Sequence, residues 1–103
     1  MKIPNKIKIG GHEYKIKYHR MPDDQSCGVA DYGKGTIYID TELIKSEQER
    51  VFFHEALHII NHELTETDVD FLAQALYAFL KENKLLRWKK QRSAKPHQFT
   101  QAY

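Results

Sequence analysis

Hydrophobic and polar residues alternate along the chain as far as Asp40. Residues 6–9 and 14–18 carry isoleucine or tyrosine at every second position, with lysines between them. This period of two residues is typical of strands with one buried face. Gly10-Gly11 lies between the two segments and favours a tight turn. Residues 27–32 and 36–40, which are joined by a glycine-containing turn, are predicted to form a second hairpin.

After Asp40 the pattern changes to one typical of helices. A first helix is predicted from about Glu47 to about Asn61, with Ser46-x-x-Glu49 as a capping box at its start. A second helix is predicted from Thr65-x-x-Asp68, with apolar residues at helical spacing up to about Lys84. So short a link favours an antiparallel helix hairpin. The predicted fold class is therefore α+β, with an antiparallel or mixed four-stranded sheet packed on two helices.

Composition indicates a globular protein with one domain. Hydrophobic residues make up 41% and charged residues 29% of the 103 residues, which is ordinary for a soluble domain. We expect the domain to span residues 1–92 and a polar, extended tail to span residues 93–103. No apolar run approaches the ~20 residues of a membrane span, and the N-terminus does not have the pattern of a signal peptide. A cytoplasmic location is the expectation.

Charge and cysteine content narrow the possible partners. The formal net charge is +2, and basic residues gather in residues 81–95. This segment lacks interleaved aromatic residues, so a solvated helix face is a better interpretation than a nucleic-acid surface. Cys27 is the only cysteine, which excludes an intramolecular disulfide and a cysteine-based zinc site. We expect Cys27 to be a small packed side chain.

The first predicted helix contains the sequence His54-Glu55-x-x-His58. Two histidines four residues apart lie on one face of a helix, because a turn holds ~3.6 residues. Both imidazoles can therefore ligate one zinc ion. Glu55 follows the first ligand directly and can take a proton from a water at the metal. The motif predicts a catalytic zinc site.

A catalytic zinc ion usually has three protein ligands. Glu66 lies near the start of the second helix, which a helix hairpin would bring back beside the end of the first. Asp70 lies four residues later on the same face, where it can accept a hydrogen bond from the outer nitrogen of a ligating histidine. The same geometry makes three neighbouring residues weaker candidates: Asp68, Glu63 and His62.

The sequence His54-Glu55-x-x-His58 followed by Glu66-x-x-x-Asp70 resembles the gluzincin metallopeptidases. The short chain and the close spacing of the two motifs are similar to those of the minigluzincins. The resemblance implies a minimal zinc-dependent endopeptidase acting on a peptide or protein substrate. It implies zinc ligands at His54, His58 and Glu66, a general base and acid at Glu55, and a supporting carboxylate at Asp70. It also implies that a strand from residues 27–40 borders the substrate cleft.

The tail, residues 93–103, is predicted to inhibit the enzyme. Pro96 breaks any helix that reaches it, and His97 is a possible inhibitory contact to zinc. Minigluzincins resemble latent enzymes held by their C-terminal segments, which favours this interpretation. Two other function classes stay open: a non-catalytic zinc-containing regulatory or binding module, and a nucleic-acid-binding domain using residues 81–95. Glu55 favours the peptidase, because a structural zinc site needs no base beside a ligand.

Overall fold

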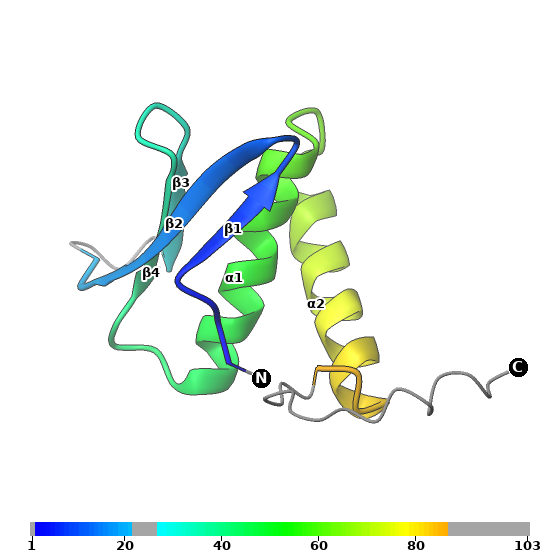
Figure 1. The fold of residues 1–103 in the computed structure, drawn as a ribbon. Coiled ribbons are helices and arrows are strands. Elements are labelled where there is room, and N and C mark those ends of the chain that lie inside the picture. Colours follow the sequence, from blue (N-terminus) through cyan, green and yellow to red (C-terminus); the bar gives the residue numbers. More distant parts are fainter. Residues whose placement is uncertain (1, 22–26, 87–103) are drawn as a thin grey trace, which may run out of the picture.

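The structure is a computed structural model, which describes residues 2–21 and 27–86. A four-stranded sheet is followed by two helices, so the predicted α+β class is confirmed (Figure 1). The elements in chain order are β1 (Lys6–Ile9), β2 (His12–His19), β3 (Gly28–Asp31), β4 (Thr36–Asp40), α1 (Lys45–Ile60) and α2 (Glu66–Glu82).

The sheet has the order β1-β2-β4-β3 and is mixed. The two predicted hairpins, β1–β2 and β3–β4, are antiparallel, and a parallel pairing of β2 with β4 joins them. Gly10 and Gly11 make the first turn with φ of 60° and 86°, values that glycine adopts without steric cost. This order leaves β3 at one edge of the sheet, beside the candidate metal centre described below.

The hydrophobic core lies between the sheet and α1. Ile37 and Ile39 on β4 are fully buried, and they pack with Val51, Phe52 and Ile59 from α1. The alternation predicted for the strands follows from this packing, because only one face of the sheet is covered by α1. Among the described elements α2 packs only against α1, so the molecule has three layers: sheet, α1 and α2 (Figure 1).

The predicted capping box at the start of α1 is wrong. The N-cap residue is Ile44, and no side chain caps the helix. The helix begins at Lys45, so Ser46 already lies within the first turn and cannot act as the cap. Glu49 is instead buried, and its carboxylate accepts a hydrogen bond of 2.6 Å from the hydroxyl of Tyr77 on α2. Contact between the two helices therefore determines the position of Glu49.

The predicted cap of α2 is confirmed. The backbone N–H of Asp68 donates to Oγ1 of Thr65 over 3.1 Å. The helix ends at Glu82, two residues before the predicted end, because Lys84 turns the chain with a φ of 59°. The backbone N–H of Leu85 closes this turn on the Leu80 carbonyl at 2.8 Å, an arrangement common at helix ends. The two helices run antiparallel (Figure 1).

Candidate metal centre

The structure brings three predicted ligands together where α1 meets the start of α2. His54 and His58 lie one turn apart on α1, and their Nε2 atoms are 3.2 Å apart. Glu66 is the first residue of α2. Its Oε2 lies 2.9 Å from His54 Nε2, and its Oε1 lies 3.0 Å from His58 Nε2. Of the residues that the structure describes, only these three form a group with the spacing of metal ligands.

These separations fit the donor set of a zinc ion. Zinc–nitrogen and zinc–oxygen bonds of 2.0–2.2 Å in a tetrahedron place neighbouring ligand atoms about 3.3–3.6 Å apart. The two histidine nitrogens are 3.2 Å apart, and Oε2 and Oε1 of Glu66 lie 2.9 and 3.0 Å from one nitrogen each, which is slightly shorter than that range. Two imidazoles and one carboxylate are also ligands that zinc commonly has in hydrolases. The Glu66 side chain is 73% exposed, which leaves the site accessible from solvent.

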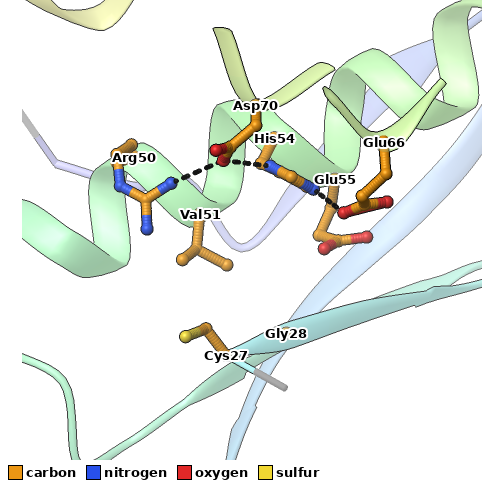
Figure 2. A pocket seen from close by; sticks show the side chains of 8 residues that line it. All are labelled: Cys27, Gly28, Arg50, Val51, His54, Glu55, Glu66 and Asp70. Atoms are coloured by element: carbon orange, nitrogen blue, oxygen red, sulfur yellow. Dashed lines mark hydrogen bonds and ion pairs between the residues drawn. The ribbon is translucent and has the colours of Figure 1, made fainter. Parts of the chain in front are cut away.

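Asp70 lies behind His54, as the sequence predicted for a supporting carboxylate. Its Oδ1 is 3.5 Å from His54 Nδ1, on the other side of the ring from Glu66. The same oxygen lies 3.5 Å from Arg50 Nη1. Arg50 is held in turn by Glu47, whose Oε1 accepts hydrogen bonds of 3.1 and 2.8 Å from its Nε and Nη2. Figure 2 shows Arg50, Asp70 and His54 in a row along one wall of the pocket.

The sequence did not single out Arg50. A signal was available, because Arg50 precedes His54 by four residues and so lies on the same face of α1. Its role depends on Asp70, which the helix hairpin brings close, and no local pattern predicts that pairing. The structure thus adds a cation to the predicted constellation.

Glu55 faces the edge strand from beside the candidate ligands (Figure 2). Its side chain is buried, at 8% exposure. Burial raises the pKa of Glu55, and the charge of Glu66 adds to this effect. His54, His58 and a hydrogen bond from the backbone N–H of Ala30 act in the opposite direction on that pKa. A carboxyl with a raised pKa is better suited to accepting and releasing a proton near neutral pH.

A pocket of about 220 Å³ lies beside this carboxyl. The edge strand β3 forms its far wall, opposite α1 (Figure 2). Gly28 approaches α1 closely, because a Cβ atom there would lie 2.7 Å from Val51 Cγ1 and from the Tyr38 carbonyl oxygen. The pocket is lined by Cys27, Gly28, Arg50, Val51, His54, Glu55, Glu66 and Asp70.

Cys27 is exposed, so the prediction of a packed side chain is wrong. It immediately precedes the edge strand β3 and contributes to the wall of the pocket, where no helix covers it. The backbone of this residue is nonetheless fixed, because its carbonyl accepts a hydrogen bond of 2.9 Å from the N–H of Asp40.

The weaker ligand candidates do not join the metal group. Asp68 takes part in the cap of α2, and Glu63 bonds through its N–H to Asn61 Oδ1 at 2.9 Å. The ring of His62 stacks on Tyr32 with a centroid separation of 4.8 Å. His97 and the rest of residues 93–103 lie outside the described residues.

Tyr32 is a second residue that the sequence did not single out. Burial raises its pKa, and the charge of Glu55 adds to this effect. Its hydroxyl donates a long hydrogen bond of 3.5 Å to the His58 carbonyl. Six tyrosines occur in the chain, so only the fold could distinguish the one near the site.

Comparisons with protein-family models, with curated proteins and with solved structures found no match. The resemblance to the minigluzincins therefore stays a prediction, and the site is interpreted from its own geometry. Within residues 2–21 and 27–86, no helix has the length and apolar character needed to cross a membrane.

Proposed function

We propose that this protein is a small zinc-dependent endopeptidase, with zinc held by His54, His58 and Glu66. The observation that carries the proposal is the convergence of these three side chains beside a buried glutamate, with the two histidine nitrogens 3.2 Å apart and a carboxylate oxygen of Glu66 within 3.0 Å of each. The buried side chains of His54 and Glu55 are costly to hold inside the fold unless they are hydrogen-bonded, paired or ligated. A bound cation offsets that cost.

In this proposal, different residues of the chain have different roles in peptide hydrolysis. Zinc, when bound, supplies a Lewis acid that polarises the scissile carbonyl and makes water more acidic. Glu55 accepts the proton of the attacking water and passes it to the leaving amine. The Ala30 N–H, which donates to Glu55, orients this carboxylate. Asp70 holds His54 through its outer nitrogen, which fixes the tautomer that can ligate a metal.

The edge position of β3 supports a substrate in extended form. An extended peptide can add to an exposed sheet edge, with main-chain hydrogen bonds giving affinity. Among the residues that the structure describes, β3 pairs only with β4, and it forms one wall of the pocket beside Glu55. A peptide lying along β3 would pass in front of the candidate metal centre. This arrangement favours an endopeptidase over a binding module in which the zinc is structural.

The proposal is tested by removing and restoring the metal. Purified chain is stripped with a chelator, reloaded with one equivalent of zinc, and assayed at each stage on a casein-type substrate and on quenched peptides. We expect hydrolysis to disappear with the zinc and to return with it. Stoichiometric zinc without any hydrolysis, for a chain ending at Arg92 as well as for the full-length chain, would instead favour a structural zinc site.

The chain ending at Arg92 also tests the predicted latency. We propose that residues 93–103, including His97, cover the cleft, within their own chain or in a neighbour. The shortened chain should then turn over the peptide faster than the full-length chain at equal zinc content. Equal rates for two folded, zinc-loaded samples would show that the tail does not block the site.

A further inference from the structure

The outer face of α2 carries an apolar stripe that nothing in the described structure covers. The stripe consists of Phe71, Leu72, Ala75, Leu76 and Phe79, spaced by one and three residues in alternation along one side of the helix. Phe71 is 68% and Phe79 is 56% exposed, and the two leucines are 41% and 39% exposed. The stripe lies on another side of α2 than Val69 and Ala73, which are the buried residues of this helix and face α1.

Such a stripe costs free energy unless a partner covers it. With roughly 200 Å² for each aromatic side chain, the exposed apolar surface of the stripe amounts to about 400 Å². The largest apolar patch on a typical monomer is about this size, and such a patch is often functional. Single exposed apolar residues elsewhere, such as Ile44, form no comparable stripe and need no such explanation.

We propose that a second copy of this chain covers the stripe, in an antiparallel α2–α2 pair centred on Ala75. The two phenylalanines of the stripe are symmetric about that residue, since Phe71 precedes it and Phe79 follows it by four residues, whereas Leu72 and Leu76 would lie opposite Ala78 and Gln74. A two-fold axis at Ala75 therefore sets Phe71 of one copy against Phe79 of the other. The small alanine at the crossing lets the helices approach closely. A two-fold interface requires this self-complementarity.

The expected dimer is weak. Two stripes would bury about 800 Å² of apolar surface, and the polar rim adds to that, which is near the low end for specific interfaces. The ends of the stripe are also unfavourable, because the exposed Asp68 and Glu82 of opposite copies would lie near one another in this register. The candidate metal centre stays open, because it lies on the side of α2 that faces α1. The inference therefore goes beyond the proposed function and does not depend on it.

Analytical ultracentrifugation of the full-length chain, from low micromolar to several hundred micromolar, tests the inference. Wild type should pass from monomer to dimer over this range. Phe79→Lys should weaken the dimer by at least about tenfold, because the two-fold axis makes each substitution count twice. Ile44→Lys, which changes another exposed apolar residue, should leave it unchanged. Glu82→Lys should strengthen it several-fold, by replacing two repulsions with two attractions.

Circular dichroism checks that each variant is folded, and no folding defect is expected because the substituted side chains are exposed. Wild type that remains monomeric over the whole range would overturn the inference and leave the stripe to residues 87–103 or to another protein. A dimer that Phe79→Lys does not weaken would overturn it as well. A dimer weakened by Phe79→Lys but also weakened by Glu82→Lys would rule out the antiparallel register.

Discussion

Asp70 Oδ1 lies 3.5 Å from His54 Nδ1, so a carboxylate of α2 supports a candidate metal ligand of α1. A proton on Nδ1, directed towards Asp70, would leave the Nε2 lone pair for a metal ion. His54 Nε2 points towards Glu66, on the opposite side of the ring. The first two turns of α2 thus supply a candidate ligand, Glu66, and the carboxylate of Asp70 beside another candidate ligand.

Replacing Asp70 should weaken metal binding without removing a ligand. Asp70→Ala is expected to lower zinc affinity by about 10–100-fold, because the His54 ring loses its fixed tautomer and orientation. Competition with a chromophoric chelator measures the change. Gln74→Ala is the matched control, since Gln74 contacts Asp70 Oδ2 at 3.4 Å from the exposed side. Equal affinities for wild type and Asp70→Ala would contradict the role of Asp70.

Arg50 should act on the metal site through Asp70. Arg50→Met is expected to lower zinc affinity several-fold, because Asp70 loses the cation 3.5 Å from its Oδ1. The double variant with Asp70→Ala should bind zinc no more weakly than Asp70→Ala alone, since residues that share one interaction are not additive. Additive losses would mean that Arg50 acts by another route. The same chelator competition provides all four affinities.

Glu66 is expected to be a zinc ligand, so its replacement should lower zinc affinity more than the replacement of Asp70 or Arg50. Glu66→Ala should lower zinc affinity by more than Asp70→Ala does, because one of three protein ligands disappears. Glu63→Ala is the control, as Glu63 is a nearby acidic residue that does not belong to the metal group. Unchanged affinity in Glu66→Ala would transfer the ligand role to Asp68, Asp70 or a group in the tail.

Much of the fold could be predicted because its signals are local. Alternation defined the strands, and helical spacing with the Thr65 cap defined α2. Which strands pair with one another was harder to predict. Alternation of apolar and polar residues shows which side chains of a strand are buried, but it does not show which strand lies beside it. The sequence therefore left both an antiparallel and a mixed sheet open, and the parallel pairing of β2 with β4 makes the sheet mixed. The capping box failed because Glu49 bonds to Tyr77, a contact 28 residues away in sequence.

In the candidate site, too, some residues could be predicted from local sequence patterns and others could not. His54, Glu55 and His58 follow from spacing within one helix, and Glu66 and Asp70 from a hairpin that the short link predicted. Arg50 was missed because its partner Asp70 lies on the other helix, and Tyr32 because its place depends on the turn between β3 and β4. Arg50 shares a helix face with His54, but no local pattern predicts its pairing with Asp70, and none distinguishes Tyr32 from the other tyrosines.

The close approach of β3 to α1 predicts a cost for any side chain at Gly28. The added Cβ of Gly28→Ala would lie 2.7 Å from the Tyr38 carbonyl oxygen and from Val51 Cγ1. Tyr38 belongs to the central strand β4, which cannot shift without disturbing the sheet. We expect a loss of about 1–3 kcal/mol in the free energy of unfolding, measured with urea. Gly33→Ala is the control, because its Cβ would meet only Asp31 Oδ1 at 3.6 Å. Equal stabilities would contradict the close packing.

The raised pKa of Glu55 predicts how the stability of the metal-free protein depends on pH. Because burial raises the pKa of Glu55 above 4.5 in the folded state, the folded state holds the proton more tightly than the unfolded state. This contribution to stability is fully present below pH 4.5 and is lost as pH rises through the folded pKa. Glu55→Gln cannot ionise, so its stability relative to wild type should increase between pH 4.5 and neutral pH. Urea unfolding of both metal-free proteins at the two pH values checks this prediction. A difference in the free energy of unfolding between Glu55→Gln and wild type that is the same at both pH values would contradict it.

The central claim is that Glu55 performs catalysis at a zinc site that it does not help to form. Its most direct test measures zinc content and quenched-peptide hydrolysis in the same samples of wild type and Glu55→Gln, each as full-length chain and as chain ending at Arg92. The account predicts one zinc per chain in every sample, and a rate at least about 10²–10⁴-fold lower in Glu55→Gln than in wild type of the same length. Zinc-loaded wild type that is inactive at both lengths, or Glu55→Gln that hydrolyses peptide at the wild-type rate, would contradict it.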